Sequence, residues 1–183
     1  EVCGHKWADI SEQGYGVSLL NDCKYGFSAQ GSTLWQTLLK CASDPNPNAD
    51  QGMHRFTYSL FPHEGSFQDA GTIEQAYCLN QPVLAAPVPA QKGSLPDQMS
   101  FIQTDAAHFV IETVKMAEDG DGVIVRGYES HDRRGMVRLR PGFAFAQAVL
   151  CDLMENELET LCVQDGAILV PVRNFEIITV KIR

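Results

Sequence analysis

The sequence lacks the features that mark several large classes of protein. No stretch approaches the ~20 consecutive apolar residues that span a bilayer, so we expect no membrane partner. Lysine and arginine number 14 against 23 aspartates and glutamates, a formal net charge of −9. Nucleic acid is therefore not an expected partner, because phosphate contacts need clustered basic side chains. A solvated strand face explains the one basic cluster better than an anion site does; the cluster comprises Arg133, Arg134, Arg138 and Arg140.

The sequence also lacks the cysteine spacing of a metal site or a disulfide framework. Its 6 cysteines form no C-x-x-C pair, and several lie in apolar runs such as AYCLN and AVLCDL. Free cysteine packs as a small hydrophobe, so we expect reduced core residues at Cys3, Cys23, Cys41, Cys78, Cys151 and Cys162. No N-x-S/T glycosylation acceptor occurs. Both observations favour a cytoplasmic protein.

Two widespread catalytic motifs, the G-x-S-x-G elbow and the G-K-[ST] phosphate loop, are absent as well. Gly14-Tyr15-Gly16 offers only G-x-G at the start of a strand, which is more typical of a bulge or a close backbone approach. The chain begins at Glu1 without an initiating Met, and we expect it to be a piece of a longer polypeptide.

The first half of the chain predicts β-structure. Residues 16–20 and 25–30 are strand-like runs, and the Asn-Asp-Cys-Lys between them is typical of a hairpin turn. Residues 32–40 (STLWQTLLK) predict a buried strand, and residues 42–52 a loop rich in Pro, Asn and Asp. Apolar and polar residues alternate along 53–61, which predicts a half-buried strand.

A single helix is predicted near residues 66–79, with Ser66 as its cap. Residues 81–98 contain four prolines and few charges, and this composition is typical of a linker. We therefore expect two β units, residues 1–80 and residues 99–183, joined by this linker.

The second half predicts a train of short strands. They are expected near 99–104, 108–117, 122–129, 135–140, 145–154, 158–163, 167–172 and 175–182. Asp-Gly dipeptides within 117–123 and 164–167 mark hairpin turns. Strands at ~8–12-residue spacing are typical of a β-sandwich. The sequence thus predicts a mainly all-β fold of antiparallel β-sandwich units with one short helix.

Few polar residues are grouped as a reaction centre requires. His5, Asp9 and Glu12 are donors of the types that bind zinc. On a strand, however, His5 and Asp9 would lie ~13 Å apart, so structural hydrogen bonding is the favoured role. His54 is expected on the apolar face of strand 53–61, which His63 also flanks, as a core histidine. Four aromatic residues either pack in the core or offer a stacking surface to a sugar: Trp7, Tyr15, Tyr25 and Trp35.

Six segments carry a more specific signal. In chain order they are HKWADISEQGYGVSLLNDCKYG, GSTLWQTLLK, ADQGMHRFTYSLFPHEGSFQDAG, EQAYCLNQP, FVIETVKMAEDGDGVIVRGYESH and AVLCDLMEN. Together they resemble the C-terminal region of glycoside hydrolase family 38 α-mannosidases, in particular the cytosolic and bacterial subclass.

The resemblance implies a function for the longer protein. Family members are metal-dependent retaining exo-mannosidases that release terminal α-linked mannose. Their nucleophile and zinc ligands lie in an N-terminal α/β barrel, so no catalytic or metal-binding residue is carried over to this chain. Residues 1–80 would close the large C-terminal β-sandwich, and residues 99–183 would form the small terminal one. The implied partners are the protein's own catalytic barrel, mannosides or oligomannosides, and a second copy in a homo-oligomer.

The resemblance also implies that this chain contributes to the periphery of the substrate cleft. The expected residues are Asn21, Asp22, Lys24 and Tyr25 at a hairpin tip, and Lys40, where family members usually carry arginine. A plain turn held by side-chain hydrogen bonds is the alternative for residues 21–25. For the whole chain the alternatives are an autonomous carbohydrate-binding module and a structural domain with an exposed apolar patch.

Overall fold

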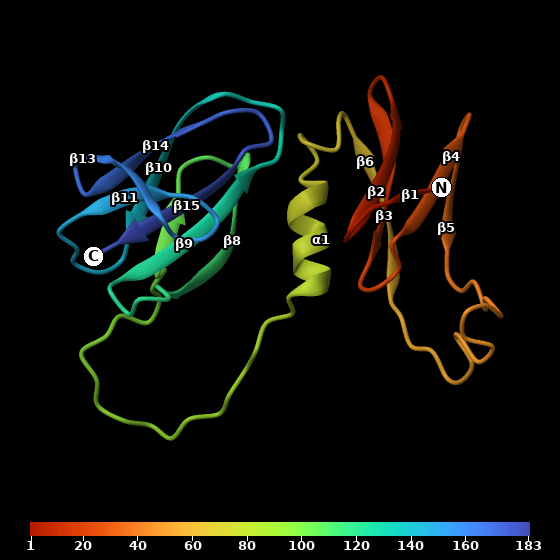
Figure 1. Cartoon of the computed structure of the whole chain (residues 1–183), viewed down its shortest axis with the longest axis horizontal. Coiled ribbons are helices and arrows are strands. Elements are labelled where there is room, and N and C mark those ends of the chain that lie inside the picture. Colours follow the sequence, from red (N-terminus) through yellow and green to blue (C-terminus); the bar gives the residue numbers. More distant parts are fainter. The chain divides into compact units, whose positions relative to one another are not determined.

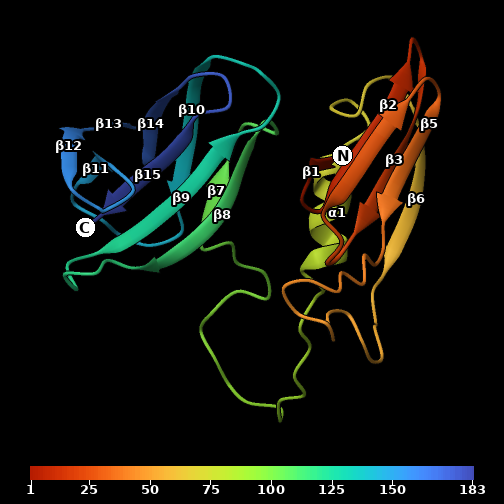
Figure 2. The same cartoon turned by 45° about the vertical axis from the view of Figure 1, so that its right-hand side comes forward.

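The structure is a computed structural model that describes all of residues 1–183, and it divides into two compact units, residues 1–89 and 90–183. All of its paired strands are antiparallel, and it contains one short helix. The mainly β fold class is therefore confirmed. The division falls within residues 81–98, which form no helix or strand and trace the long connection in Figure 2.

The first unit contains two small sheets and the helix. One sheet has the order β2–β3–β6 and the other the order β1–β4–β5. Figure 1 shows helix α1 on one side of the β2–β3–β6 sheet and strands β4 and β5 on the other. The elements are β1 (Val2–Cys3), β2 (Trp7–Glu12), β3 (Tyr15–Asn21), β4 (Gly26–Gln30), β5 (Thr33–Thr37), β6 (Tyr58–Glu64) and α1 (Thr72–Asn80).

The two faces of the β2–β3–β6 sheet differ because successive side chains of a strand point to opposite sides. Ser18 and Leu20 of β3 are buried on the face of the sheet toward α1. Ile73 and Ala76 of α1 are also buried. On the opposite face, Leu60 of β6 remains 67% exposed. This unit therefore has one well-covered sheet face and one apolar face that is open in part.

The second unit is a two-sheet sandwich. Its sheets have the orders β13–β14–β10–β7 and β12–β11–β15–β9–β8. The strands are β7 (Ile102–Thr104), β8 (Phe109–Met116), β9 (Val123–Glu129), β10 (Gly135–Pro141), β11 (Ala148–Cys151), β12 (Glu157–Thr160), β13 (Cys162–Gln164), β14 (Ala167–Val172) and β15 (Ile177–Ile182). The Asp-Gly turns join β8 to β9 and β13 to β14, and both pairs are hairpins as predicted.

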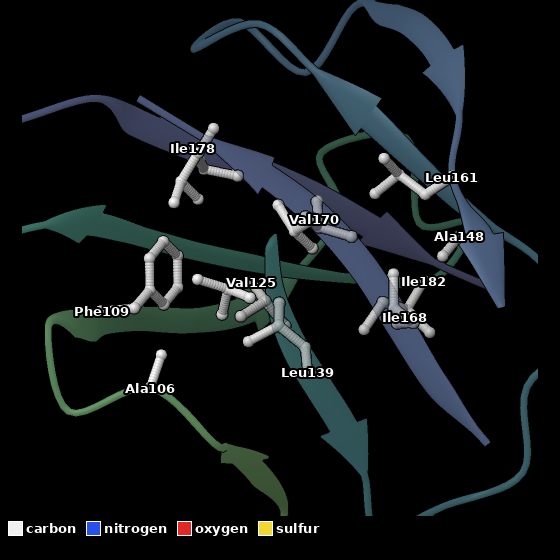
Figure 3. Packing of buried hydrophobic residues seen from close by; sticks show 13 residues of the cluster. Ala106, Phe109, Val125, Leu139, Ala148, Leu161, Ile168, Val170, Ile178 and Ile182 are labelled. Carbon is white, nitrogen blue, oxygen red and sulfur yellow. The ribbon is translucent and has the colours of Figure 1, made fainter. Parts of the chain in front are cut away.

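Alternation along these strands builds the core of the second unit. Val125 of β9, Leu139 of β10 and Val170 of β14 each have 1% of their surface exposed or less. Figure 3 shows their side chains converging with Ile178 and Phe109 between the two sheets. The core includes only residues of the second unit, so this unit encloses its own hydrophobic interior.

Two elements of the first unit begin later than predicted. The strand expected at 53–61 runs from Tyr58 to Glu64, because Asp22 binds both backbone groups of Thr57. The helix expected at 66–79 begins at Thr72. Ser66 does form its predicted hydrogen bonds with Asp69, but these close an isolated turn, since Gly71 takes a left-handed φ of 71°.

Two burial predictions for the first unit and the cysteines were wrong. All six cysteines are free, but only Cys151 is buried. Strand β5 was predicted to be buried, yet Trp35 is 47% exposed. Both errors have the same cause: an apolar run marks residues that can be buried, whereas the neighbouring elements decide whether they are.

Candidate functional site

The segment predicted as a hairpin tip, residues 21–25, is instead a crossover between two sheets. Strand β3 pairs with β2 on one edge and β6 on the other. Both of its edges are occupied, so β4 cannot pair with it and joins β1 and β5 instead. The hairpin prediction was therefore wrong, although the segment is still a tight connection.

Side-chain hydrogen bonds fix the start of this crossover. The buried Asn21 accepts the Lys24 backbone N–H on its Oδ1 at 2.8 Å. Asp22 accepts the Thr57 backbone N–H on its Oδ1 at 2.9 Å, and that hydrogen bond is the main cause that lowers the pKa of the Asp22 carboxyl. This arrangement fits the alternative of a turn held by side-chain hydrogen bonds.

The later crossover residues place polar and aromatic groups at the surface. The Lys24 Nζ lies 4.9 Å from the centre of the Phe56 ring. Tyr25 is half exposed, and the His5 ring lies 4.6 Å from its ring centre. Gln36 of β5 donates from Nε2 to the Lys24 carbonyl at 3.3 Å, which fastens the crossover to the second sheet. The cleft role predicted for these residues stays a prediction.

Lys40 lies in a neighbouring loop that Asp50 organises. The Asp50 Oδ2 accepts the backbone N–H groups of Cys41 at 2.9 Å and Lys40 at 3.3 Å. These two bonds, that of Cys41 first, lower the pKa of the Asp50 carboxyl, and the charge of Lys24 lowers it further. The cleft role predicted for Lys40 likewise stays a prediction.

The sequence analysis missed a network of buried polar groups beneath α1. Asp9 Oδ2 accepts hydrogen bonds from Ser18 Oγ at 2.7 Å and from His63 Nε2 at 2.8 Å. Ser18 Oγ lies 2.7 Å from Thr72 Oγ1, the hydroxyl of the first helical residue. Strand register places Asp9 beside Ser18 and His63 beside Gly16, and Thr72 of α1 adds the last hydroxyl of the network.

Gly16 is required for this network to close. A Cβ atom at position 16 would lie 2.4 Å from Cε1 of the buried His63 and 2.7 Å from the Ser11 Cβ. The close backbone approach predicted for the G-x-G pattern is therefore present at Gly16.

The other polar candidates do not converge. His5 lies against Tyr25, Glu12 is exposed, and Asp9 is bound to Ser18 and His63, so hydrogen bonding is the observed role of Asp9. His54 was predicted in the core, but it is exposed in a loop, with Nε2 2.7 Å from the Asp50 carbonyl. No group of three or more His, Cys, Asp or Glu is arranged to hold a metal ion. The one helix, α1, is neither long enough nor apolar enough to cross a bilayer.

The fold and its two units can now be compared with known proteins. The glycosyl hydrolases family 38 C-terminal domain matches residues 1–48, and the C-terminal beta sandwich domain of the same family matches residues 108–180. The chain therefore belongs to glycosyl hydrolase family 38, as part of its C-terminal β region.

The relatives narrow the comparison to α-mannosidases. Alpha-mannosidase 2C1 from Homo sapiens is 44% identical over 159 residues, which is 85% of this chain and 15% of that relative. The Mus musculus protein of the same name is 40% identical over 183 residues, 97% of this chain and 17% of the relative. A solved structure of an α-mannosidase from Enterococcus faecalis V583 shares the fold, with a TM-score of 0.81 and 22% sequence identity. The match covers 99% of this chain and 21% of the Enterococcus faecalis chain. The chain spans less than a fifth of the length of these curated relatives.

Proposed function

We propose that this chain is the C-terminal β region of an α-mannosidase that hydrolyses terminal α-linked mannose. The observation that supports this most strongly is the match to two proteins called alpha-mannosidase 2C1, at 44% identity over 85% of the chain and at 40% identity over 97% of it. Identity of this level across both units is far beyond what a shared β-sandwich alone requires.

The longer protein would be a metal-dependent, retaining enzyme of the cytoplasm. Its nucleophile and its zinc, or another divalent metal, would lie in an N-terminal catalytic barrel. The present chain would support the cleft by packing against that barrel. The crossover at Asn21, Asp22, Lys24 and Tyr25, together with Lys40, would form part of the rim that faces the sugar.

The open sheet face of the first unit supports the packing role. Leu60 and Tyr58 of β6 and Tyr15 of β3 are each more than half exposed on the face opposite α1. Contiguous exposed apolar surface usually marks an interaction site. A region that covers less than a fifth of its relatives is expected to expose such a surface where the rest of the protein packs.

Hydrolysis of 4-nitrophenyl α-mannoside tests this division of labour. The full-length protein should release nitrophenol and lose activity when a chelator removes its metal, whereas the isolated 183-residue chain should release none with or without added zinc. Turnover by the isolated chain, or an inactive full-length protein with metal bound, would contradict the proposal. Leu60→Asp should lower the thermal midpoint of the full-length protein, and Val83→Asp, in the exposed linker, serves as the matched control.

The second candidate function is an autonomous carbohydrate-binding module. Exposed Tyr25 and Trp35 favour it, because aromatic faces stack on sugars. This candidate predicts that mannose or an oligomannoside shifts the NMR signals of the isolated chain. Tyr25→Ala or Trp35→Ala should then make the shifts smaller. A flat titration would remove this candidate and leave the proposed function intact.

A further inference from the structure

The second unit contains three Asp-Gly dipeptides, and all three lie in turns. Asp119-Gly120 and Asp121-Gly122 lie between β8 and β9, and Asp165-Gly166 lies between β13 and β14. An Asp-Gly bond can rearrange without an enzyme, because glycine has no side chain to hinder the attack of its backbone nitrogen on the preceding carboxyl group. The attack needs a free carboxyl group and a free amide nitrogen, so the fold decides which of the three dipeptides reacts.

The rearrangement needs no oxidant or reductant, and water is its only co-reactant. The glycine nitrogen bonds to the aspartate Cγ, and the amide proton leaves with the carboxyl hydroxyl group as water, which gives a succinimide ring. Solvent water then opens the ring. Breaking the new bond restores aspartate, whereas breaking the original peptide bond leaves isoaspartate, with a free α-carboxylate and an extra carbon atom in the main chain. The neutral acid is the reactive form, because a carboxylate has no hydroxyl group to lose.

The fold protects the first dipeptide at both reacting groups. Asp119 accepts Lys181 Nζ on Oδ2 at 2.5 Å and the Asp121 backbone N–H on Oδ1 at 3.0 Å. The hydrogen bond from Lys181 is the first of the causes that lower the pKa of the Asp119 carboxyl, so the neutral acid is scarcer there. The Gly120 backbone N–H, which would have to attack, donates to the Ala117 carbonyl at 2.9 Å.

The second dipeptide is protected by an ion pair and by packing. Asp121 Oδ2 lies 2.8 Å from Arg183 Nε. Gly122 is half-buried, and a Cβ built on it would lie 2.4 Å from the Ile182 carbonyl oxygen. Ring closure requires the peptide unit between Asp121 and Gly122 to rotate, and the close contact with Ile182 opposes that rotation.

The third dipeptide lacks all of these protections. Asp165 and Gly166 are exposed at the tip of the β13–β14 hairpin. The Asp165 carboxylate makes no hydrogen bond or ion pair, and the Gly166 N–H makes no hydrogen bond. A Cβ built on Gly166 would meet no atom within 4 Å, so nothing packs against the glycine. Both reacting groups are therefore free at this turn alone.

Arg140 of β10 activates the amide that must attack. Its Nη1 donates to the Asp165 carbonyl oxygen at 3.0 Å, and that oxygen belongs to the same peptide unit as the Gly166 nitrogen. A guanidinium on the carbonyl oxygen draws electrons from the amide, so the nitrogen loses its proton more readily. The same guanidinium would then face the free α-carboxylate of isoaspartate, because that carboxylate arises from the Asp165 carbonyl group.

We propose that Asp165 is a modification site at which the folded protein converts spontaneously to isoaspartate, with Arg140 as the positioning residue. The extra main-chain carbon would lengthen the turn that pairs Gln164 with Ala167. Strand β13 lies at the edge of its sheet and pairs only with β14, so the expected consequence is a loosened edge in the aged protein. The inference does not depend on the proposed enzymatic function.

Ageing of the 183-residue chain at physiological temperature and mildly acidic pH, followed by peptide mapping, tests the site. An isomerised peptide elutes apart from its parent at unchanged mass, and endoproteinase Asp-N does not cut before isoaspartate. In the folded chain isoaspartate should accumulate at Asp165 and not at Asp119 or Asp121, whereas in urea all three should react at similar rates. An unmodified Asp165 in the folded chain, or equal reaction at all three positions, would overturn the proposal. The same preference for Asp165 in urea would also overturn it, because local sequence would then be the cause.

Variants of Arg140 separate activation from support of the turn. Arg140→Gln should slow the reaction about threefold, and Arg140→Lys, which keeps a cation, should recover most of the rate. If Arg140 only held the turn in place, its removal would free the turn and speed the reaction, and that result would refute the assigned role. Arg138→Gln is the matched control on the same strand, because Arg138 lies 3.9 Å from Asp105 instead and should leave the rate unchanged.

Discussion

At the scale of single residues, the direction of the hydrogen bonds around Asp9 can be assigned. Ser18 has one hydroxyl proton, and it donates that proton to Asp9. Thr72 must then be the donor in its contact with Ser18. Both Ser18 and His63 donate to the same carboxylate oxygen, Oδ2 of Asp9. The network thus joins β2, β3, β6 and α1 through one buried carboxylate.

Gly16→Ala should break this network. The added Cβ would lie 2.4 Å from the buried His63 ring, and that ring cannot move without disturbing Asp9. We expect a loss of about 1–3 kcal/mol in the free energy of unfolding of the first unit, as for other overpacked sites. Chemical denaturation measures the loss.

The control is Gly93→Ala, since no atom lies within 4 Å of a Cβ built at Gly93. His63→Ala provides a second comparison, because Gly16→Ala should cost less once the ring is gone. An unchanged cost in that background would show that the ring is not the obstacle.

At the scale of elements, connections are fastened by side chains that reach across strands. Helix α1 is tied to β3 at both ends, through Thr72 to Ser18 and through Asn80 Nδ2 to the Asn21 carbonyl at 2.9 Å. In the second unit, Glu129 of β9 ties the β14–β15 turn through the Phe175 N–H. A short element therefore owes its position to a few specific polar contacts.

The Glu129 contacts predict a pH dependence of stability. Burial raises the pKa of this carboxyl, but the backbone N–H groups of Phe175, His131 and Arg133 lower it, and the net shift is downward. Because the folded-state pKa lies below the unfolded value of about 4.3, the ionised carboxylate stabilises the fold at pH values above about 4.3. This contribution is lost as the pH falls through the folded-state pKa.

Glu129→Gln should therefore cost about 1–3 kcal/mol at neutral pH, because a charged acceptor of backbone N–H groups is lost. The difference from wild type should shrink as the pH is lowered into the acid range. Urea titrations at several pH values measure it, with the exposed Glu74→Gln as the control. A difference that stays constant with pH would mean that the charge of Glu129 is not responsible.

At the scale of the whole molecule, the chain consists of two units, and the hydrophobic core cluster of buried residues lies entirely in the second. Charged contacts tie strands of the second unit to nearby turns: Lys181 of β15 binds Asp119 at 2.5 Å, and Lys115 of β8 binds Glu155 at 2.7 Å. The second unit should therefore keep its structure when the connection to the first unit is cut.

Lys92 offers a way to test this independence. It is the only basic residue in the exposed, irregular segment 81–98, so brief trypsin treatment should cut there and Lys92→Ala should prevent that cut. The fragment 93–183 should retain its β-sheet circular dichroism and unfold cooperatively. Loss of that signal, or rapid degradation of the fragment, would show that the two units depend on each other.

Local sequence patterns predicted most strands of the second unit, but the single strand expected at 158–163 is divided into β12 and β13, which lie in different sheets. Alternating residues and Asp-Gly turns gave the β8–β9 and β13–β14 hairpins, because pattern and turn chemistry there act over a few neighbouring residues. The ordered segments likewise identified the family, which the comparisons confirm.

Outside these hairpins, contacts between distant segments set which strands pair and which polar groups meet. Nothing local shows that β3 and β4 belong to different sheets, since that depends on β6 occupying the second edge of β3. Asp9 and His63 are 54 positions apart and meet only because β2 and β6 flank β3. Local patterns fix the conformation of a short segment, but partners and burial are set by contacts between segments that are distant in the chain.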